Sequence, residues 1–289
     1  LDIGSNDGTM LNFYNNNLIK VGIDPIINKF KKNYQKIKYP INSFFQKKII
    51  RQKVGNNNFK VITALSMFYD LENPNKFLSD IKSLLDKNGI FILEHADLLS
   101  IIKNNIFDTI CHEHLEYYSS YVIINMAKKN KMRVFNHKFN DVNGGSSQYY
   151  ICHENSNIKN QNKNLQKVLN LEDKYRLKNK NKYFKFIKKI DNNKKKLVKF
   201  LKELKKSKKS IHGYGASTKG NVLLQYFGIG NKMIDYISER NPQKFDCYTP
   251  GTKIKIISEN ESRSIRPNYY LVLPWHFKKE ILKREINVR

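Results

Sequence analysis

Cysteine, proline, tryptophan and acidic residues are all scarce in this sequence. Its 289 residues include 3 Cys, 7 Pro and 1 Trp. The cysteines, Cys111, Cys152 and Cys247, lie far apart and form no Cys-x-x-Cys pair, which argues against a disulfide scaffold and a local zinc cluster. No apolar run approaches the roughly 20 residues of a membrane helix, and no signal peptide is recognisable. We therefore expect a cytoplasmic protein that does not bind membranes.

The shortage of acids makes the chain strongly basic. It has 53 Lys and Arg against 25 Asp and Glu, for a net charge of +28. Such an excess is typical of proteins that bind nucleic acid or anionic membranes. The high content of Lys, Asn, Ile, Tyr and Phe favours a simpler cause, a biased surface composition. A phosphorylated small substrate would also benefit from the excess, so the charge alone leaves the anionic partner open.

The length predicts about two domains of roughly 100–200 residues each. Apolar strands alternate with amphipathic helices over the first half, which is the pattern of a parallel α/β sheet. A helix is predicted over 73–89, with Gly89 as its stop signal. A further helix follows residue 120, and a turn is predicted at 143–145. Strands are predicted at 20–24, 59–65, 89–95, 132–135 and 148–152.

The second half begins with a lysine-rich stretch. Residues 159–209 hold 20 Lys and Arg against 4 Asp and Glu, and their apolar residues recur at spacings of three and four, which predicts one or two amphipathic linker helices. A second α/β unit follows, with strands at 210–215, 233–238 and 269–274 and a helix over 221–228 that ends at a glycine. The predicted domains are therefore 1–156, a linker 157–209, and 210–289.

The segment Leu1–Leu11, LDIGSNDGTML, reads as a strand, a glycine turn and the start of a helix. Gly4 and Gly8 let the backbone approach a ligand closely. Asp24 ends the next strand, where an acidic residue can bind ribose hydroxyls. The spacing is not the Gly-x-Gly-x-x-Gly of dinucleotide sites. It resembles the looser acidic-x-Gly-x-x-x-Gly turn of S-adenosylmethionine (SAM) methyltransferases, starting here at Asp2. An ordinary strand–helix turn is the alternative.

The segment FDTICHEHLEYYS interrupts the α/β alternation and brings together His112, Glu113, His114, Tyr117 and Tyr118. A His-x-His pair on a strand would share one face and could bind a metal, but no third ligand is near. General acid–base chemistry is favoured, because histidine titrates near neutral pH and a glutamate can stabilise its charged form. C-methylation needs such a base, because SAM supplies none and the acceptor carbon must first become an enolate. A polar loop is the alternative.

The segment HGYGASTKGN, residues 212–221, is a second glycine turn between a strand and a helix. It is not a Walker A loop, since no glycine directly precedes Lys219 and no Ser or Thr follows it. Backbone N–H groups at a helix start, hydroxyls and an ammonium predict a phosphate or diphosphate site. A purely structural turn is the alternative.

Taken together, these motifs resemble a known family. GSNDG, GIDP, CHEHLEYYS, NGGS, GYGASTKGN, RNPQK, PGT and LPWHF occur in the order found in sugar C-methyltransferases, which act on nucleotide-linked keto-deoxysugars. The resemblance covers essentially the whole chain. It implies a Rossmann-like SAM methyltransferase domain, a helical linker and a second Rossmann-like α/β domain that holds the nucleotide-sugar. It also implies a zinc-binding module upstream of Leu1, so we expect no metal in this chain.

The resemblance implies that His114 is the general base and Glu113 its neighbouring carboxylate. We further expect Glu113 and Tyr117 or Tyr118 to orient the base or stabilise the enolate, and His112 completes the predicted catalytic set. Two positions depart from the family. Cys111 stands where a tyrosine is frequent, and the stretch 66–70 lacks a histidine, although Tyr69 is a candidate donor there. These departures concern the choice of acceptor rather than the reaction type.

Two binding sets complete the prediction. Methyl-donor residues are Asp2, Gly4, Ser5, Asn6, Gly8, Leu11, Asp24, Pro25, Phe44, Ala64 and Ser66. Substrate residues are Gly213, Tyr214, Gly215, Ser217, Lys219, Asn221, Arg240 and Trp275. The predicted reaction adds a methyl group alpha to the ketone of a nucleotide-diphosphate keto-deoxysugar, after His114 forms the enolate.

Two other functions stay open. The first is an O- or N-methyltransferase, and the second is a basic RNA-binding methyltransferase, which the lack of an aromatic–basic RNA motif disfavours. A homologue without activity is a third possibility. We expect a monomer or a weak homodimer.

Overall fold

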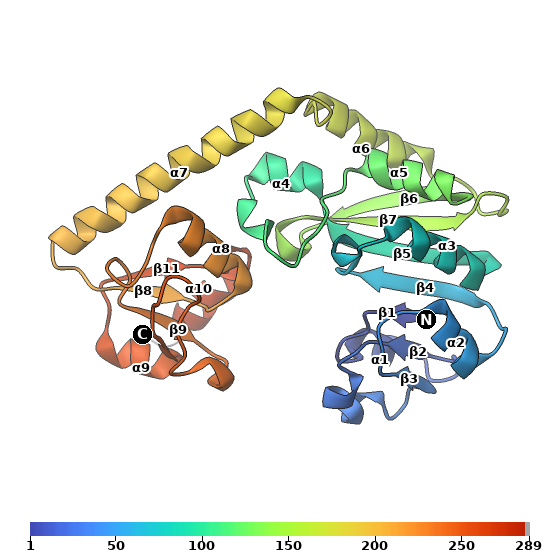
Figure 1. Ribbon diagram of the computed structural model, residues 1–289, viewed down its shortest axis with the longest axis horizontal. Coiled ribbons are helices and arrows are strands. Elements are labelled where there is room, and N and C mark those ends of the chain that lie inside the picture. The colour runs from blue at the N-terminus through green and yellow to red at the C-terminus, as the bar shows by residue number, and fades with distance from the viewer. Residues whose placement is uncertain (287–289) are drawn as a thin grey trace. The chain divides into compact units, whose positions relative to one another are not determined.

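The computed structural model describes residues 1–286, and these form two compact units. The first unit comprises Leu1–Ser100 and Leu115–Lys178. The second comprises Ile101–His114 and the chain from Asn179 onward. Each unit contains its own β-sheet (Figure 1). No helix of the described residues is long and apolar enough to cross a membrane.

The first unit is built on a seven-stranded sheet of order β3-β2-β1-β4-β5-β7-β6 (Figure 1). Strands β1 to β5 run parallel, and β7 is antiparallel to both β5 and β6. The strand order reverses between β1 and β4, so ligands are expected beyond the carboxyl ends of these strands. The strands are β1 Asp2–Ile3, β2 Val21–Ile23, β3 Tyr39–Ile41, β4 Phe59–Leu65, β5 Leu85–Ala96, β6 Met132–Asn140 and β7 Ser146–His153.

The core of this unit lies on both faces of the sheet, as the continuous apolar runs of its parallel strands require. Its buried side chains come from the central strands and from the helices α3 and α5. The helices of this part of the chain are α1 Thr9–Phe13, α2 Lys47–Val54, α3 Pro74–Leu84, α4 Leu98–Asn104, α5 Ser120–Lys129 and α6 Asn162–Lys174. The predicted parallel α/β fold is confirmed.

The predicted end of the helix over 73–89 is wrong. The start is as expected, because the Asn73 side chain accepts the Lys76 N–H at 2.9 Å and Pro74 occupies the first turn. However, the helix ends at Leu84, and the fully buried Leu85 already pairs with Phe59 of β4. Gly89 therefore lies within β5, where a Cβ atom would sit only 2.8 Å from the Phe59 carbonyl oxygen. Pairing with β4 overrides the local stop signal.

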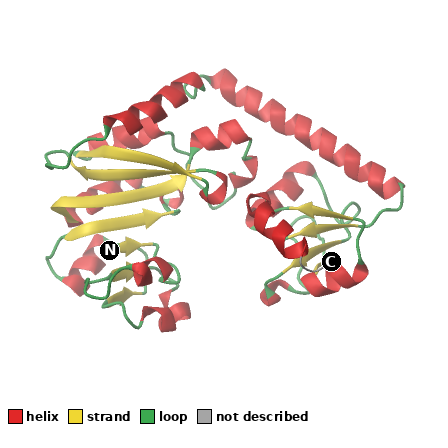
Figure 2. Cartoon of the chain, turned by 180° about the vertical axis from the view of Figure 1, so that it is seen from behind, coloured by secondary structure: helices red, strands yellow, loops and turns green. Residues whose placement is uncertain are grey.

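The second unit has a four-stranded parallel sheet of order β10-β9-β8-β11 (Figure 2). This confirms the second, smaller Rossmann-like domain. Helix α8 begins at Ser217, whose hydroxyl accepts the Gly220 N–H, and ends at Gly228 in the left-handed conformation. The strands are β8 Ile211–Tyr214, β9 Tyr236–Glu239, β10 Ile256–Ser258 and β11 Tyr269–Val272. The helices are α7 Lys180–Lys206, α8 Thr218–Phe227, α9 Glu259–Ile265 and α10 Lys278–Ile286.

The two predicted linker helices exist as α6 and α7, but they belong to different units. Helix α6 is tied to α5, because the Glu172 carboxylate accepts the N–H groups of Ser120 and Tyr121 at 2.5 and 3.2 Å. Helix α7 is tied to the second sheet through the Lys205–Asp235 ion pair at 2.7 Å. The limits of the two units therefore differ from the predicted domain limits 1–156, 157–209 and 210–289. The predicted linker is divided after Lys178, and Ile101–His114 belongs to the second unit.

Candidate functional site

The first glycine turn connects β1 to α1 at the carboxyl edge of the first sheet. Gly4 and Gly8 have φ angles of 71° and 76°, which L side chains rarely adopt. A Cβ atom on Gly8 would lie 3.0 Å from the Tyr34 ring, and one on Gly4 would lie 3.3 Å from the Met67 side chain. Both glycines are therefore required by conformation and by space.

Asp24, at the end of β2, holds this turn in place. Its carboxylate accepts the Asn6 N–H at 3.0 Å and the Ile26 N–H at 2.9 Å. The Ser5 and Tyr34 hydroxyls lie 2.8 Å apart, and the Tyr34 hydroxyl donates to the Asn6 carbonyl oxygen at 3.0 Å. Burial raises the pKa of Tyr34 to about 12, so this hydroxyl stays a neutral donor. Asp24 itself is only half-buried, and its carboxylate has lone pairs for further donors.

The other predicted donor residues divide into edge positions and core positions. Ser66 follows β4 with a positive φ of 56°, and its N–H donates to the Glu94 carbonyl oxygen at 2.9 Å. Pro25 and Phe44 are exposed beyond β2 and β3. Beneath the turn, Asp2 is buried and accepts the Thr63 hydroxyl at 2.6 Å, and burial raises its pKa. Leu11 and Ala64 are buried core residues.

These positions fit a methyl donor of the SAM type. The turn and the residues that follow β2, β3 and β4 share the carboxyl edge of a parallel sheet, where the strand order reverses. Gly4 and Asn6 of the turn are exposed, whereas Ser5 and Gly8 are buried. Asp24 can accept hydroxyl protons of a ribose, and Asp2, Leu11 and Ala64 lie beneath this edge.

The His-Glu-His segment forms a tight turn rather than a strand. The His114 N–H donates to the Cys111 carbonyl oxygen at 3.3 Å, and His114 Nδ1 lies 3.5 Å from the Thr109 hydroxyl oxygen. His112 and Glu113 are exposed. Among the described residues no cluster of three or more His, Cys, Asp or Glu side chains could hold a metal ion.

The charges in this turn favour an ionised glutamate. Its own backbone N–H, the Cys111 thiol and the two neighbouring imidazoles lower the pKa of Glu113. Burial and the Glu113 carboxylate raise the pKa of the Cys111 thiol, which therefore stays protonated. The turn thus presents an ionised carboxylate between two imidazoles.

The two predicted catalytic tyrosines, Tyr117 and Tyr118, follow His114 in the sequence and belong to the first unit. The N–H groups of Leu115 and Glu116 donate to the Tyr69 carbonyl oxygen at 2.9 and 3.1 Å, which fixes the chain before the tyrosines. Tyr118 is only 4% exposed and its ring packs 5.2 Å from that of Phe68. Burial raises the pKa of Tyr118, and its hydroxyl has no hydrogen-bond partner among the described residues. Tyr117 is half-buried.

The second glycine turn is held by an acid that sequence reasoning missed. Glu239, at the end of β9, accepts the N–H groups of Ala216, Arg240 and Asn241 at 2.7, 2.7 and 2.8 Å. Burial by itself would raise the pKa of Glu239, but these three donors and Lys244 lower it below its usual range. The signal was present in the sequence, because Glu239 follows the strand after its glycine turn just as Asp24 does.

A cavity of about 420 Å³ opens at this second turn. Of the predicted substrate residues, Tyr214, Gly215, Ser217 and Arg240 line it, together with the cations Lys244 and Arg284. One wall is an ion-pair network of α9 and α10, in which Arg284 lies 2.9 Å from Glu259 and donates to the Tyr214 hydroxyl at 2.9 Å.

The remaining predicted substrate residues, Gly213, Lys219, Asn221 and Trp275, are not among the residues that line this cavity. Gly213 is a packing position, because a Cβ atom there would lie 2.4 Å from the Ile237 side chain. The indole N–H of Trp275 donates to the Asp108 carboxylate at 2.8 Å.

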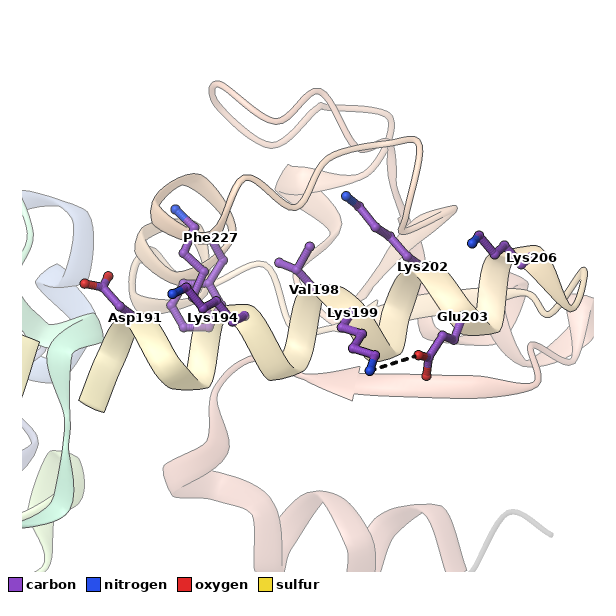
Figure 3. Close-up of a pocket in the computed structure, with 9 residues that line it drawn as sticks. Asp191, Lys194, Val198, Lys199, Lys202, Glu203, Lys206 and Phe227 are labelled. Atoms are coloured by element: carbon purple, nitrogen blue, oxygen red, sulfur yellow. Dashed lines mark ion pairs between the residues drawn. The ribbon is translucent and has the colours of Figure 1, made fainter. Parts of the chain in front are cut away.

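A larger cavity, of about 750 Å³, runs along α7 (Figure 3). Five lysines of this helix line it, and the Phe227 ring of α8 lies at one end. Lys194 donates to the Tyr226 carbonyl oxygen at 2.7 Å, and Lys199 lies 3.9 Å from Glu203. None of the predicted site residues lines it, so we treat it as the basic face of the helix.

Comparison with known families assigns both halves of the chain. Residues 141–289 match the model of the C-methyltransferase C-terminal domain, and residues 1–134 match that of a methyltransferase domain. The C-methyltransferase NovU of Streptomyces niveus is 26% identical over 226 residues, which make up 78% of this chain and 54% of NovU. The chain thus spans about half the length of this relative.

Two solved structures align with about half of the chain. Magnesium protoporphyrin IX methyltransferase from Synechocystis PCC 6803 is 13% identical, with a TM-score of 0.39 over 53% of this chain and 72% of that one. An S-adenosylmethionine-dependent methyltransferase from Clostridium acetobutylicum ATCC 824 is 12% identical, with a TM-score of 0.41 over 53% of this chain and 82% of that one.

Proposed function

The chain belongs to the C-methyltransferase family, and from this premise we propose that it methylates the carbon alpha to the ketone of a nucleotide-diphosphate keto-deoxysugar. The observation that carries the proposal is the order of the two matched regions, a methyltransferase domain followed by the C-methyltransferase C-terminal domain. SAM is the proposed methyl donor, and it supplies an electrophilic methyl group on a sulfonium.

The first glycine turn supports donor binding. Gly4 and Gly8 allow the positive φ angles of this turn, and Asp24 would accept hydrogen bonds from ribose hydroxyls. Residues 1–24 contain the acids Asp2, Asp7 and Asp24 and a single cation, Lys20. This excess of acid is suited to a positively charged donor.

The His-Glu-His turn supports proton removal. In our proposal the alpha proton of the acceptor passes to Nε2 of His114, because Nδ1 faces the Thr109 hydroxyl. The ionised Glu113 carboxylate stabilises the imidazolium that results. The enolate carbon would then take the methyl group from the donor, whose sulfur–methyl bond breaks to release neutral S-adenosylhomocysteine. Until then the enolate oxygen needs a hydrogen-bond donor. We assign that role to His112 or Tyr117, because the Tyr118 ring is enclosed in the core.

The cavity of the second unit supports nucleotide binding. Two backbone donors of this turn are already used, because the Ala216 N–H donates to Glu239 and the Gly220 N–H donates to the Ser217 hydroxyl. Phosphate binding here would therefore depend on cationic side chains. Arg240 and Lys244 would supply that charge, because Arg284 is already paired with Glu259. Arginine and lysine are the side chains that bind phosphate oxygens most readily.

The decisive experiment combines calorimetry with product analysis. S-adenosylhomocysteine is titrated into the wild-type chain and into Asp24→Ala, and nucleotide-linked keto-sugars are then assayed with SAM in deuterated water. We expect donor binding that Asp24→Ala weakens, deuterium exchange alpha to the ketone, and a methyl group that stays on carbon after hydrolysis. A methyl group released by hydrolysis from oxygen or nitrogen would establish the O- or N-methyltransferase alternative.

A further inference from the structure

The segment Ile101–His114 packs in the second unit, although the chain on either side of it belongs to the first. This short stretch contains His112, Glu113 and His114, the proposed base and its neighbours. The proposed methyl-donor turn lies in the other unit, within Leu1–Ser100. The contacts that fasten the segment therefore decide which unit carries the base.

Two contacts fasten it through side chains just before the turn. Asp108 is only 3% exposed, and its carboxylate accepts the indole N–H of Trp275 at 2.8 Å. The Phe107 ring stacks on that of Phe227 in α8, with ring centres 5.1 Å apart and an interplanar angle of 12°. The Phe107 ring also lies 5.9 Å from that of Tyr226.

Charged groups of the second unit surround the same carboxylate. Burial lowers the pKa of Lys219, while the negative charge of Asp108 opposes that shift. Burial and Lys219 lower the pKa of His276, and Asp108 again opposes. Asp108 thus faces an indole donor, an ammonium and an imidazole. A buried carboxylate with such partners is costly to expose or to leave unpaired, which makes this contact specific.

We propose that Asp108 and Trp275 are positioning residues that hold the His112–His114 turn on the second unit. The catalytic reading of that turn rests on the proposed function above. Trp275 then acts through Asp108 rather than by binding the substrate, and the nucleotide cavity and the base are carried by one unit.

The test uses Trp275→Phe, which keeps one aromatic ring and removes the indole N–H together with the second ring, and Asp108→Asn, which keeps an acceptor oxygen for Trp275. Asp108→Ala removes the contact altogether. Tyr248→Phe is the matched control, because it also removes one polar hydrogen from an exposed aromatic residue of the second unit. Thermal unfolding of each variant verifies that it is folded.

The first measurement is amide hydrogen exchange, which needs no substrate. Trp275→Phe and Asp108→Ala each remove a hydrogen bond that involves a charged group. Amide exchange over residues 107–114 should therefore become faster by about tenfold or more. Asp108→Asn should change it less, and Tyr248→Phe should leave it unchanged. Unaltered exchange in folded Trp275→Phe and Asp108→Ala would overturn the anchor, whatever reaction the protein catalyses.

The second measurement separates positioning from substrate binding. With the nucleotide keto-sugar, we expect Trp275→Phe to lower kcat about tenfold while KM and the affinity for S-adenosylhomocysteine stay unchanged. The double variant with Asp108→Ala should be no slower than Asp108→Ala alone, because both remove one contact. A raised KM with unchanged kcat would make Trp275 a substrate ligand and overturn the proposal. The exchange experiment tests the anchor without substrate, so its result does not depend on the proposed function. The proposed function fails separately, if His114→Ala is as active as wild type.

Discussion

The two glycine turns of this protein are both held by an acid at the end of the next strand, but their chemical surroundings differ. In the first unit the Asp24 carboxylate accepts one N–H from the turn, that of Asn6, and one from its own loop, that of Ile26. In the second unit the Glu239 carboxylate accepts the turn N–H of Ala216 and the loop N–H groups of Arg240 and Asn241. An acid at the end of the second strand thus closes both turns.

The difference lies in what surrounds each acid. Asp2 and Asp7 accompany Asp24, and the nearest cation in the sequence, Lys20, donates to the Tyr14 carbonyl oxygen. Around Glu239, by contrast, Arg240 and Lys244 line the cavity, and the Lys244 ammonium donates to the Ala216 carbonyl oxygen at 2.7 Å. This difference in local charge is the basis of our proposal that the first turn takes a cationic donor and the second an anionic substrate.

The largest effect is expected away from both turns, at His114. Replacing His114 with Ala should lower kcat by about 10²–10⁴-fold, the usual contribution of a general base, and abolish deuterium exchange into the acceptor. Affinity for S-adenosylhomocysteine should not change, because the donor turn lies in the first unit. Exchange at the wild-type rate in this variant would remove His114 from the mechanism.

Substituting the acid at each turn should weaken the binding of only one of the two ligands. Asp24→Ala should weaken S-adenosylhomocysteine binding by about 10- to 100-fold, since it removes charged hydrogen bonds to the turn and to the ligand. Glu239→Ala should leave that affinity unchanged and raise KM for the nucleotide-sugar. Calorimetry and steady-state kinetics on both variants measure the four values. Equal effects of the two substitutions on donor binding would contradict the assignment of one ligand to each turn.

Glycine substitutions test how tightly each turn is built. A Cβ atom on Gly215, at a φ of 86°, would lie 2.8 Å from the Pro274 ring, so Gly215→Ala should destabilise the protein by about 1–3 kcal/mol. Gly228→Ala is the matched control, because its φ is also positive at 68° but no atom lies within 4 Å of the new Cβ. It should cost about 1 kcal/mol or less. Urea unfolding of both variants gives the comparison, and a larger loss at Gly228 would refute it.

The smallest effect is a pH dependence at the second turn. Because its donors lower the folded-state pKa of Glu239, this carboxylate stabilises the fold above its unfolded pKa of about 4.5 and loses that contribution as the pH falls. Glu239→Gln should therefore be less stable than wild type at pH 7, and the gap should narrow near pH 4. Urea unfolding at both values measures it. A gap that widens on acidification would show the opposite sign.

Much of the fold and part of the site were predictable from local patterns. Strand β4 coincides with the predicted 59–65, and the glycine turn predicted at Gly4 and Gly8 is present between β1 and α1. The end of α3 was not predictable from local patterns, because Leu85 pairs with Phe59, which belongs to a strand more than twenty residues earlier. Glu239 was overlooked although the rule that identified Asp24 also applies to it. Tyr118 was predicted near the base, yet its ring is packed in the core.

The sequence by itself determined the alternation of strands and helices, the two glycine turns and the residue types of the His-Glu-His segment. These features depend on hydrophobic periodicity and on conformational preferences that act over a few residues. Only the tertiary structure decided that this segment packs in the second unit. The contact responsible joins Asp108 to Trp275, which are 167 positions apart, and a hydrogen bond between such distant residues exists only once the second sheet has brought them together.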